Sequence, residues 1–325
     1  MEEAQRPSVG ASGVEISRIG LGGYELGPEP DEEPDVQRAA GVIGAAIECA
    51  VNWLDTSENY LATHNEQVIG EALQLVGGDF LVASKVAPGA AITGGGSGFR
   101  REQVLKACHD SLARVRRDHL DIYFLHWPDD TGIPLEETWE AMAELADAGL
   151  VRAIGLSNYE LEDVERCHRQ RRVDVVQVGL SLIDYLEHRP YIASCGELGI
   201  AVTIYEPLAS GILTGSTMEQ ILAIWDGPWL ESSFYKRLLG PGNAERSFAV
   251  ADGLRPIAEE LNATVAQVAI AWVLHQPGVT AAIAGSRSEQ HTRDNAGGAR
   301  LALSPAILAR IEELIPLGPA APTPA

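Results

Sequence analysis

The stretch "VNWLDTSENY", residues 51–60, places a carboxylate, Asp55, directly after a short apolar run and a phenol, Tyr60, five positions later. The apolar run is typical of a strand that is buried on both faces. Asp55 is then expected at the C-terminal end of that strand. What the carboxylate and the phenol do there depends on the fold that the other apolar runs of the chain indicate.

Seven further runs rich in Val, Ile and Leu are similar to this one, and segments with a helical spacing of apolar residues lie between several of them. The helical stripes cover residues 36–47, 104–115, 135–145 and 265–272. Strands that alternate with helices predict an α/β fold, a (β/α)8 TIM barrel, over a single domain of residues 1–325. The eight apolar runs begin at Ser17, Val51, Phe80, Leu120, Val151, Val173, Ala201 and Val279.

Two additions to a bare barrel are predicted. The interval 208–279, after the seventh strand, is far longer than the other crossovers, which indicates a long loop with helices of its own. Ser304 and Pro305 are typical of an N-cap and a first helical residue, so an extra C-terminal helix should begin there. Residues 317–325 are expected to form a flexible tail. The glycines of residues 93–98 lack the spacing of a dinucleotide-binding fingerprint.

The charge balance and the cysteines exclude several classes of protein. The formal net charge of −22 disfavours nucleic acid and anionic membranes as partners, because their phosphates would be repelled. The four cysteines form no CxxC pair, so neither a metal site nor a disulfide framework is expected. The N-terminus lacks the basic and apolar regions of a signal peptide, and no run approaches the roughly 18 apolar residues of a membrane span. These features predict a cytoplasmic protein.

Four polar residues follow the second, third and fourth predicted strands: Asp55, Tyr60, Lys85 and His126. A phenol ionises only near pH 10, but a neighbouring ammonium such as that of Lys85 would draw its pKa down. Asp55 would supply the counter-ion that the ammonium needs, and His126 would hydrogen-bond a substrate oxygen. Each residue alone has a structural interpretation, as a helix cap, a rim aromatic or a core histidine. Together they indicate an acid site for a carbonyl.

This joint pattern resembles the aldo-keto reductase superfamily, whose tetrad of Asp, Tyr, Lys and His corresponds in order to the four residues above. Within the superfamily, the chain resembles bacterial members of the branch that includes the potassium-channel β-subunits. The resemblance covers nearly the whole chain, and several strings carry it: "LDTSENY" from Leu54, "SKV" around Lys85, "LHWPD" from Leu125, "VRAIGLSN" from Val151, "YEPLASGILTG" from Tyr205 and "AGSRSEQHTRDN" from Ala284.

The resemblance implies a nicotinamide cofactor, normally NADPH with NADH as a possible substitute, bound across the barrel mouth. Ser157, Asn158 and Gln177 would hold its carboxamide, and Tyr205 would stack on its ring. Ser286 and Arg287 would meet a 2′-phosphate. The "TGS" at residues 214–216 lacks the lysine that often follows in relatives, which leaves Arg287 as the clearest cation for that phosphate. The complete implied set is Gly22, Gly23, Ser157, Asn158, Gln177, Tyr205, Pro207, Leu208, Gly211, Leu213, Gly285, Ser286, Arg287, His291, Asp294 and Asn295.

The expected activity is the reduction of an aldehyde or ketone to an alcohol, with hydride from the nicotinamide and a proton from Tyr60. The partners are therefore small-molecule carbonyls or alcohols, and the choice between monomer and homo-oligomer stays open. Two rival functions remain: a cofactor-binding regulatory subunit of a channel-like assembly, and a lyase or isomerase that uses Lys85 as a Schiff base. Aromatic residues are expected to line the substrate pocket, namely Tyr24, Trp53, Trp127 and Trp229.

Overall fold

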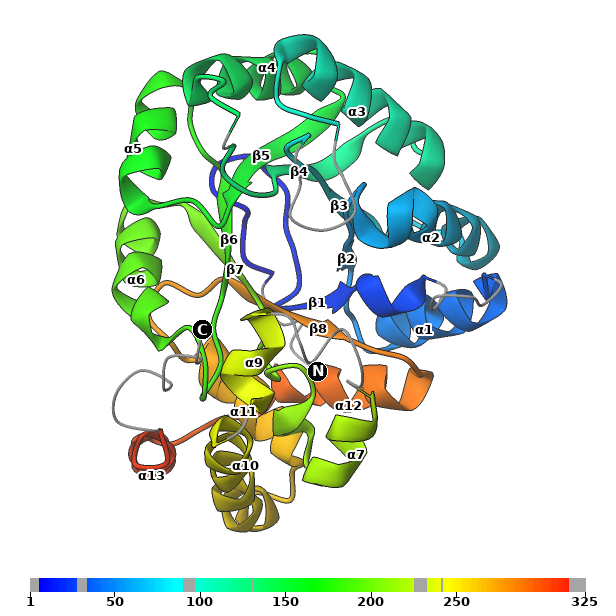
Figure 1. Cartoon of the computed structure of the whole chain (residues 1–325). Coiled ribbons are helices and arrows are strands. Elements are labelled where there is room, and N and C mark those ends of the chain that lie inside the picture. The colour runs from blue at the N-terminus through cyan, green and yellow to red at the C-terminus, as the bar shows by residue number, and fades with distance from the viewer. Residues whose placement is uncertain are drawn as a thin grey trace.

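The computed structural model describes residues 6–27, 34–89, 97–129, 131–224, 233–240 and 242–315. Within these residues, eight parallel strands close into a barrel in sequence order, and the last strand pairs with the first (Figure 1). Each predicted apolar run contains one of them, so the predicted TIM barrel is confirmed. The strands are β1 Ile19–Gly22, β2 Trp53–Asp55, β3 Leu81–Val86, β4 Leu120–Leu125, β5 Val151–Ser157, β6 Val175–Gly179, β7 Ala201–Tyr205 and β8 Ala281–Gly285.

Helices surround the barrel and form the crossovers between its strands. Those up to β7 are α1 Val36–Glu48, α2 His64–Val76, α3 Arg101–Val115, α4 Leu135–Asp147, α5 Leu161–Gln170 and α6 Arg189–Glu197. Those after β7 are α7 Met218–Ile224, α9 Ser233–Leu239, α10 Asn243–Glu260, α11 Val265–Leu274, α12 Glu289–Gly298 and α13 Pro305–Glu312. Short 3-10 turns are η1 Tyr24–Leu26, η2 Tyr60–Thr63, η3 Leu186–His188 and η4 Ile212–Thr214.

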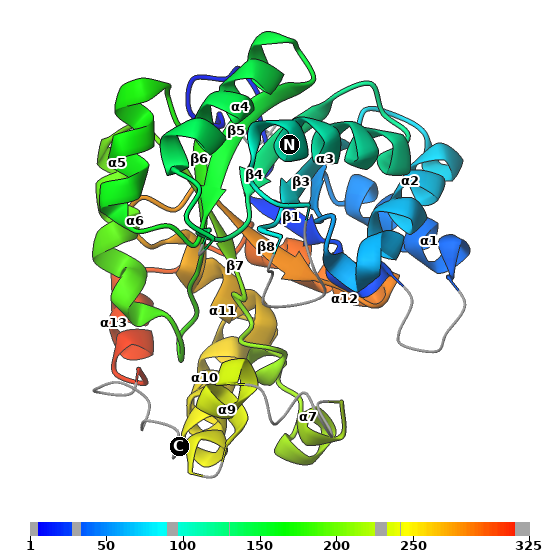
Figure 2. The same cartoon turned by 45° about the horizontal axis from the view of Figure 1, so that its top comes forward.

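Both predicted additions are present. The segment after β7 carries α7, α9 and α10 before the crossover helix α11, and Figures 1 and 2 show these helices gathered on one side of the barrel. The C-terminal helix α13 begins as predicted, because the Ser304 side chain accepts a hydrogen bond from the Ile307 N–H and Pro305 occupies the first turn. The predicted tail, residues 317–325, lies outside the described residues.

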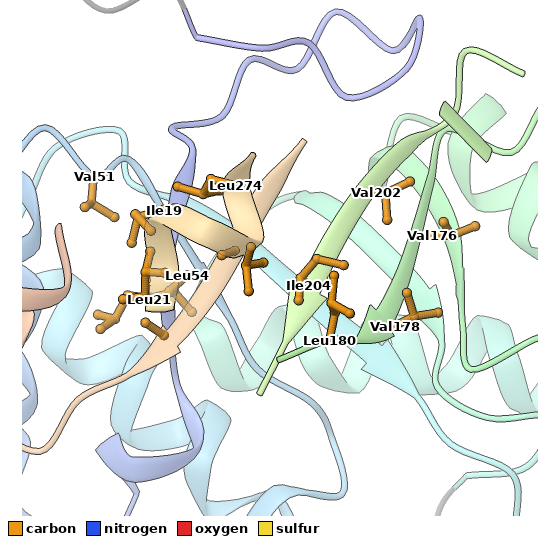
Figure 3. Packing of buried hydrophobic residues seen from close by; sticks show 14 of the residues in the cluster. Ile19, Leu21, Val51, Leu54, Val176, Val178, Leu180, Val202, Ile204 and Leu274 are labelled. Carbon is orange, nitrogen blue, oxygen red and sulfur yellow. The ribbon is translucent and has the colours of Figure 1, made fainter. Parts of the chain in front are cut away.

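Within most strands the apolar side chains alternate between two cores, as a period of two predicts. Ile19, Leu21 and Leu54 face outward and pack with the surrounding helices in the larger core, and Figure 3 shows this packing together with that of Val176 and Val202. The neighbouring positions of the strands face inward and form a second, smaller core inside the barrel. Its members are Val9, Val14, Ile16, Trp53, Ala83, Ile122, Phe124, Ala153, Val175, Ala201, Ala281 and Ile283.

The N-terminal segment closes one end of the barrel. Ser8 and Glu15 form an antiparallel bridge, and the Val9, Val14 and Ile16 between and beside them are fully buried in the inner core. The Trp53 indole belongs to the same core and donates a hydrogen bond to the Ser17 carbonyl at 3.0 Å. The opposite end, at which the strands finish, is therefore the end available to a ligand, as in other barrels of this type.

Gly20 provides a test of packing in this inner core. A Cβ added there would lie 2.4 Å from the Trp53 ring, which is fully buried and has no room to shift. Gly20→Ala is expected to destabilise the protein by about 1–3 kcal/mol through overpacking. The matched control is Gly44→Ala in α1, where an added Cβ meets nothing within 4 Å and alanine should favour the helix by up to about 1 kcal/mol. Urea unfolding of both variants measures the difference, and equal stabilities would contradict the packing described.

In the described residues no single helix has both the length and the apolar character to span a membrane; α10 and α11 meet that test only jointly, and they are bent by 94° at their junction. The four cysteines are free thiols, and Cys108, Cys167 and Cys195 are buried.

Candidate active site

The strand alternation brings three of the predicted residues to the open mouth. Asp55 and Lys85 lie two residues beyond Trp53 and Ala83, which face the inner core, so both side chains point inward one layer higher. His126 follows the last residue of β4 with the same inward orientation as Phe124. Tyr60 comes from the first turn after β2. The four residues from three strands therefore meet at the C-terminal end of the barrel.

Lys85 is the centre of the group. Its ammonium is fully buried, 2.6 Å from Asp55 Oδ2, and it donates further hydrogen bonds to the Thr56 carbonyl at 2.8 Å and the Tyr60 hydroxyl oxygen at 3.3 Å. An ammonium has three N–H donors, and these contacts engage all of them. Because the Tyr60 oxygen accepts from Lys85, the hydroxyl proton is left to face another acceptor.

The pKa of Tyr60 is raised, whereas the sequence predicted that it would be lowered. Burial raises the pKa of Tyr60 well above its usual value, and the negative charges of Asp55 and Glu25 raise it further. Lys85 does not offset this, because Asp55 neutralises its charge and burial itself lowers the pKa of Lys85. The expected lowering of the phenol pKa is therefore not found: the effects of burial and of the carboxylates outweigh that of Lys85, and the pKa of Tyr60 lies above its usual value. The phenol is held protonated, which is the form that donates a proton.

His126 is held neutral beside Tyr60. Burial lowers the pKa of His126 well below its usual value, and the charge of Lys85 lowers it further. The ring lies edge-on to the Tyr60 ring with centroids 5.7 Å apart, and Trp127 stacks on it with centroids 3.5 Å apart. Its Nδ1 lies 3.0 Å from the Ser57 hydroxyl. A neutral imidazole next to a protonated phenol provides two groups that can hydrogen-bond one oxygen atom.

Polar side chains at the ends of β5, β6 and β7 connect to this group. Gln177 Nε2 donates to Asp55 Oδ1 at 2.8 Å, a contact that uses one of the two N–H groups of the amide and leaves Oε1 out. Asn158 donates to the His126 carbonyl and to the Ser157 hydroxyl, both at 3.1 Å, and its Oδ1 accepts from the Tyr205 hydroxyl at 2.8 Å. The Tyr205 ring is thereby fixed at the mouth, on the side opposite Lys85 in the strand order.

The loop after β7 has an unusual backbone. Glu206, Ala209 and Ser210 all have positive φ, as does Gly211 at 93°. For non-glycine residues this conformation is sparsely populated, and such strain is concentrated at functional sites. The loop is fixed by Glu206, whose half-buried carboxylate accepts from the Ser210 backbone N–H and hydroxyl. It contains the predicted residues Pro207, Leu208, Gly211 and Leu213, of which Leu213 is fully buried.

The predicted residues around β8 and α12 make mostly internal contacts. The Ser286 hydroxyl bonds within the first turn of α12, and Asn295 donates to the Gly285 carbonyl at 3.0 Å. The Asp294 carboxylate accepts from α11, through the side chains of its cap and first turn. Arg287 and His291 are exposed. Gly22 and Gly285, at the ends of β1 and β8, are paired in the sheet. The backbone N–H of Gly23 donates a hydrogen bond to the Asp55 carbonyl.

The predicted substrate residues divide three ways. Tyr24 lies at the mouth, 37% exposed and edge-on to Tyr60 with centroids 5.2 Å apart, and Trp127 lies against His126. Trp53 does not reach the mouth: it faces the closed end, one layer below Asp55, so its assignment to the substrate pocket is wrong. The physical reason is that every second residue of β2 points into the barrel, but only the last one lies at its open end. Trp229 lies outside the described residues.

Sequence reasoning missed the residues that position the tetrad. Thr56 supplies the carbonyl that Lys85 binds, Ser57 contacts His126, and Asn59 lies 2.6 Å from the Ser57 hydroxyl. All three lie within residues 51–60, between Asp55 and Tyr60. No local sequence pattern predicts the role of Ser57, because His126, which it contacts, is 69 residues away in the chain.

Comparison with known proteins agrees with this geometry. Residues 18–316 match the model of the aldo/keto reductase family. The chain is 28% identical over 333 residues to a probable voltage-gated potassium channel subunit beta of Arabidopsis thaliana, with 98% of each chain covered. It is 25% identical over 325 residues to the NADH-specific methylglyoxal reductase of Escherichia coli, covering 94% of this chain and 97% of the relative.

A solved structure has the same fold. The glycerol dehydrogenase AKR11B4 from Gluconobacter oxydans superimposes with a TM-score of 0.84 at 24% identity, covering 100% of this chain and 98% of the other. The family match over most of the chain, the closed barrel and the residues gathered at its mouth lead to one conclusion: the chain belongs to the aldo/keto reductase family and is an oxidoreductase of carbonyl compounds.

Proposed function

We propose that the protein reduces an aldehyde or ketone to an alcohol with a reduced nicotinamide dinucleotide, and that Tyr60 donates the proton. The observation that carries this proposal is the contact from Lys85 Nζ to the Tyr60 oxygen at 3.3 Å. It leaves the phenol O–H pointing away from its only cationic neighbour in the tetrad, and burial keeps that phenol protonated by raising its pKa. A proton donor of this kind accelerates a reaction by roughly 10²–10⁴-fold.

The mouth suits an extended dinucleotide. Glycines stand at the ends of β1 and β8, where the two strands pack closely: a Cβ on Gly22 would lie 3.0 Å from the Gly285 backbone, and one on Gly285 would lie 2.5 Å from the Glu25 carboxylate. Glycine at such positions lets backbone and ligand approach closely once the flexible Glu25 side chain moves. We assign the carboxamide to Ser157, Asn158 and Gln177, the ring to Tyr205, and the pyrophosphate to the strained loop after β7. When bound, the cofactor supplies the hydride. The chain holds and orients it, and Tyr60 and His126 together bind the carbonyl oxygen.

NADPH is proposed as the preferred cofactor because Arg287, exposed at the start of α12, can offer a charge-assisted bond to a 2′-phosphate. NADH is the competing choice. The similar Escherichia coli protein is named as NADH-specific, and this chain as a whole is strongly acidic, which disfavours an additional phosphate. The ratio of the two cofactors therefore depends chiefly on Arg287.

The rival function as a Schiff-base lyase conflicts with the environment of Lys85. A lysine nucleophile must be neutral and accessible, whereas Lys85 is fully buried and its N–H groups are engaged by Asp55, Thr56 and Tyr60. An attack by Lys85 on a carbonyl would require the ammonium to lose a proton and at least one of these contacts, and to turn the freed lone pair toward the substrate.

The test is an assay of carbonyl-dependent loss of reduced-nicotinamide absorbance with NADPH and NADH, over pH 5–10 and a panel of aldehydes and ketones. We expect reduction with at least one cofactor. The pKa of His126 lies below the usual range and that of Tyr60 above it, so the neutral imidazole and the protonated phenol both persist across neutral pH. The rate constant kcat should therefore show no inflection near pH 6.5, the usual pKa of histidine. A clear inflection there would contradict these assignments.

A regulatory role in a larger assembly is the second candidate, because a similar Arabidopsis protein is named as a probable potassium channel subunit. The complete arrangement of Asp55, Tyr60, Lys85 and His126 favours the enzyme. Copurification of a membrane partner, together with no turnover of any carbonyl in the assay above, would favour the regulatory role.

A further inference from the structure

Arg237, on the helix α9 that follows β7, contacts the loop that follows β6. Its Nε donates to Asp184 Oδ2 at 2.6 Å, and its Nη2 donates to the Tyr185 hydroxyl. The guanidinium also lies over the Tyr185 ring, with Cζ 4.3 Å from the ring centroid. One cation therefore holds a carboxylate and an aromatic ring that are 53 and 52 residues away from it in the chain.

The Tyr185 ring packs directly on the backbone at the end of β6. A Cβ on Gly179, the last residue of that strand, would lie 2.4 Å from the ring. Gly179 is paired in the sheet with Tyr205, the last residue of β7. The two tyrosine rings meet edge-on, with centroids 5.7 Å apart and an angle of 80° between their planes, an arrangement that aromatic pairs favour.

Tyr205 is thus fixed at two points. Its hydroxyl donates to Asn158 Oδ1 at 2.8 Å, and its ring contacts the ring of Tyr185. Asn158 in turn donates to the His126 carbonyl at 3.1 Å, so a continuous series of contacts connects Arg237 with the tetrad. A ring that is fixed in advance loses less entropy when a ligand stacks on it, and the ligand binds more tightly for that reason.

We propose that Arg237 is a positioning residue for the nicotinamide ring: through Tyr185 it fixes the Tyr205 ring on which the nicotinamide stacks. Arg237 acts through the Tyr185 side chain and not by contact with the reacting atoms. The inference rests on the proposed function, in which Tyr205 carries the nicotinamide. It gives the helix α9 a part in cofactor binding, although α9 is not one of the helices that connect successive strands of a bare barrel.

A purely structural role for Arg237 would be to hold α9 against the barrel, and two kinds of ligand separate that role from the proposed one. NADPH and NADH carry the nicotinamide ring. 2′-Phospho-ADP-ribose and ADP-ribose, respectively, have the same diphosphate and adenosine parts without that ring. If Arg237 fixes the Tyr205 ring, its loss weakens the binding of the complete cofactor only. If its loss merely loosens α9, the two kinds of ligand are affected alike.

Arg237→Ala should raise the Kd of the cofactor that binds more tightly by about two- to twelvefold, the cost of ordering one side chain on binding. The Kd of the matching ligand without nicotinamide should not change. Isothermal titration calorimetry measures both constants. An unchanged Kd for the cofactor, or an equal loss for both ligands, would overturn the inference while the proposed function stands. If the unmodified protein bound neither NADPH nor NADH, the proposed function itself would fail.

Variants of the intermediate ring test whether Arg237 acts through it. Tyr185→Leu removes the ring and should weaken cofactor binding as much as Arg237→Ala does, whereas Tyr185→Phe keeps the ring and should retain most of the affinity. The double variant Tyr185→Leu/Arg237→Ala should be no weaker than either single variant, because both remove the same support. Gly179→Ala displaces the ring without removing either side chain and should give the same selective loss. Additive losses in the double variant would overturn the inference.

Arg152→Ala is the matched control. Arg152 stands near the start of β5, at the closed end of the barrel, and donates to Asp121 at 2.8 Å. The side chains of Asp121 and Asp184 are 8% and 14% exposed, so each substitution leaves a shielded carboxylate without its guanidinium. Urea unfolding should show a loss of stability in both variants, but only Arg237→Ala should weaken cofactor binding. An equal weakening in Arg152→Ala would mean a general loss of stability and would contradict the inference.

Discussion

Tyr60→Phe is expected to lower kcat for carbonyl reduction by roughly 10²–10⁴-fold, the contribution of a positioned general acid. The ring remains to pack against Tyr24 and His126, so the shape of the mouth should be kept. Only the hydroxyl that accepts from Lys85 is lost. Binding of the cofactor, followed by quenching of tryptophan fluorescence, should therefore persist while turnover is lost.

The control for this variant is Tyr123→Phe. Tyr123 is fully buried on β4 and belongs to the outer core, so it faces the helices rather than the mouth. Removal of its hydroxyl should leave kcat unchanged. If Tyr60→Phe reduced a good substrate at the rate of the unmodified enzyme, the assignment of the proton donor would be wrong.

Lys85→Met is expected to abolish activity and also to destabilise the fold by about 3–5 kcal/mol, the usual result of leaving a buried charge without its partner. The side chain of Asp55 is only 6% exposed, so water cannot replace the ammonium. Gln177 would continue to donate to Asp55, but a neutral amide compensates only in part. Guanidinium unfolding and steady-state kinetics give the two quantities.

The double variant Asp55→Leu/Lys85→Met separates stability from catalysis. It removes both charges and fills the space with apolar groups, a change that is often neutral or stabilising for a buried ion pair. We expect a free energy of unfolding close to that of the unmodified protein and activity as low as in Lys85→Met. A double variant as unstable as the single one would mean that packing, rather than the unpaired charge, accounts for the loss.

The fold was predictable because its signals are local and repeated. Eight apolar runs at spacings that fit a strand and a helix predict a parallel barrel, and the cap at Ser304 with Pro305 predicts the last helix. The helices α7, α9 and α10 were anticipated only as additional helices within the interval 208–279, without bounds. The position of α10 depends on its contacts with α9 and α11, which no local pattern specifies.

The site was predictable as a set of residues but not as an electrostatic environment. The tetrad stands at strand ends, and the ends of parallel strands must meet, so its convergence follows from the fold. The pKa of Tyr60 depends instead on burial and on the carboxylates of Asp55, Glu25 and Glu206. These lie at the end of β2, in the turn after β1 and directly after β7. An ammonium placed beside an exposed phenol predicts a lowered phenol pKa, whereas the pKa of the buried Tyr60 is raised.

By itself, the amino-acid sequence determined the order of strands and helices, which faces of the strands are apolar, and that Asp55, Lys85 and His126 stand at the C-terminal ends of strands. Those properties depend on neighbours within a few positions of the chain, so they can be predicted from local sequence patterns. Only the tertiary structure decided that Trp53 faces the closed end, that the Tyr60 phenol is held protonated, and that Ser57 lies against His126. Each of these depends on depth in the barrel and on partners far away in the chain, which are set only when the strands close.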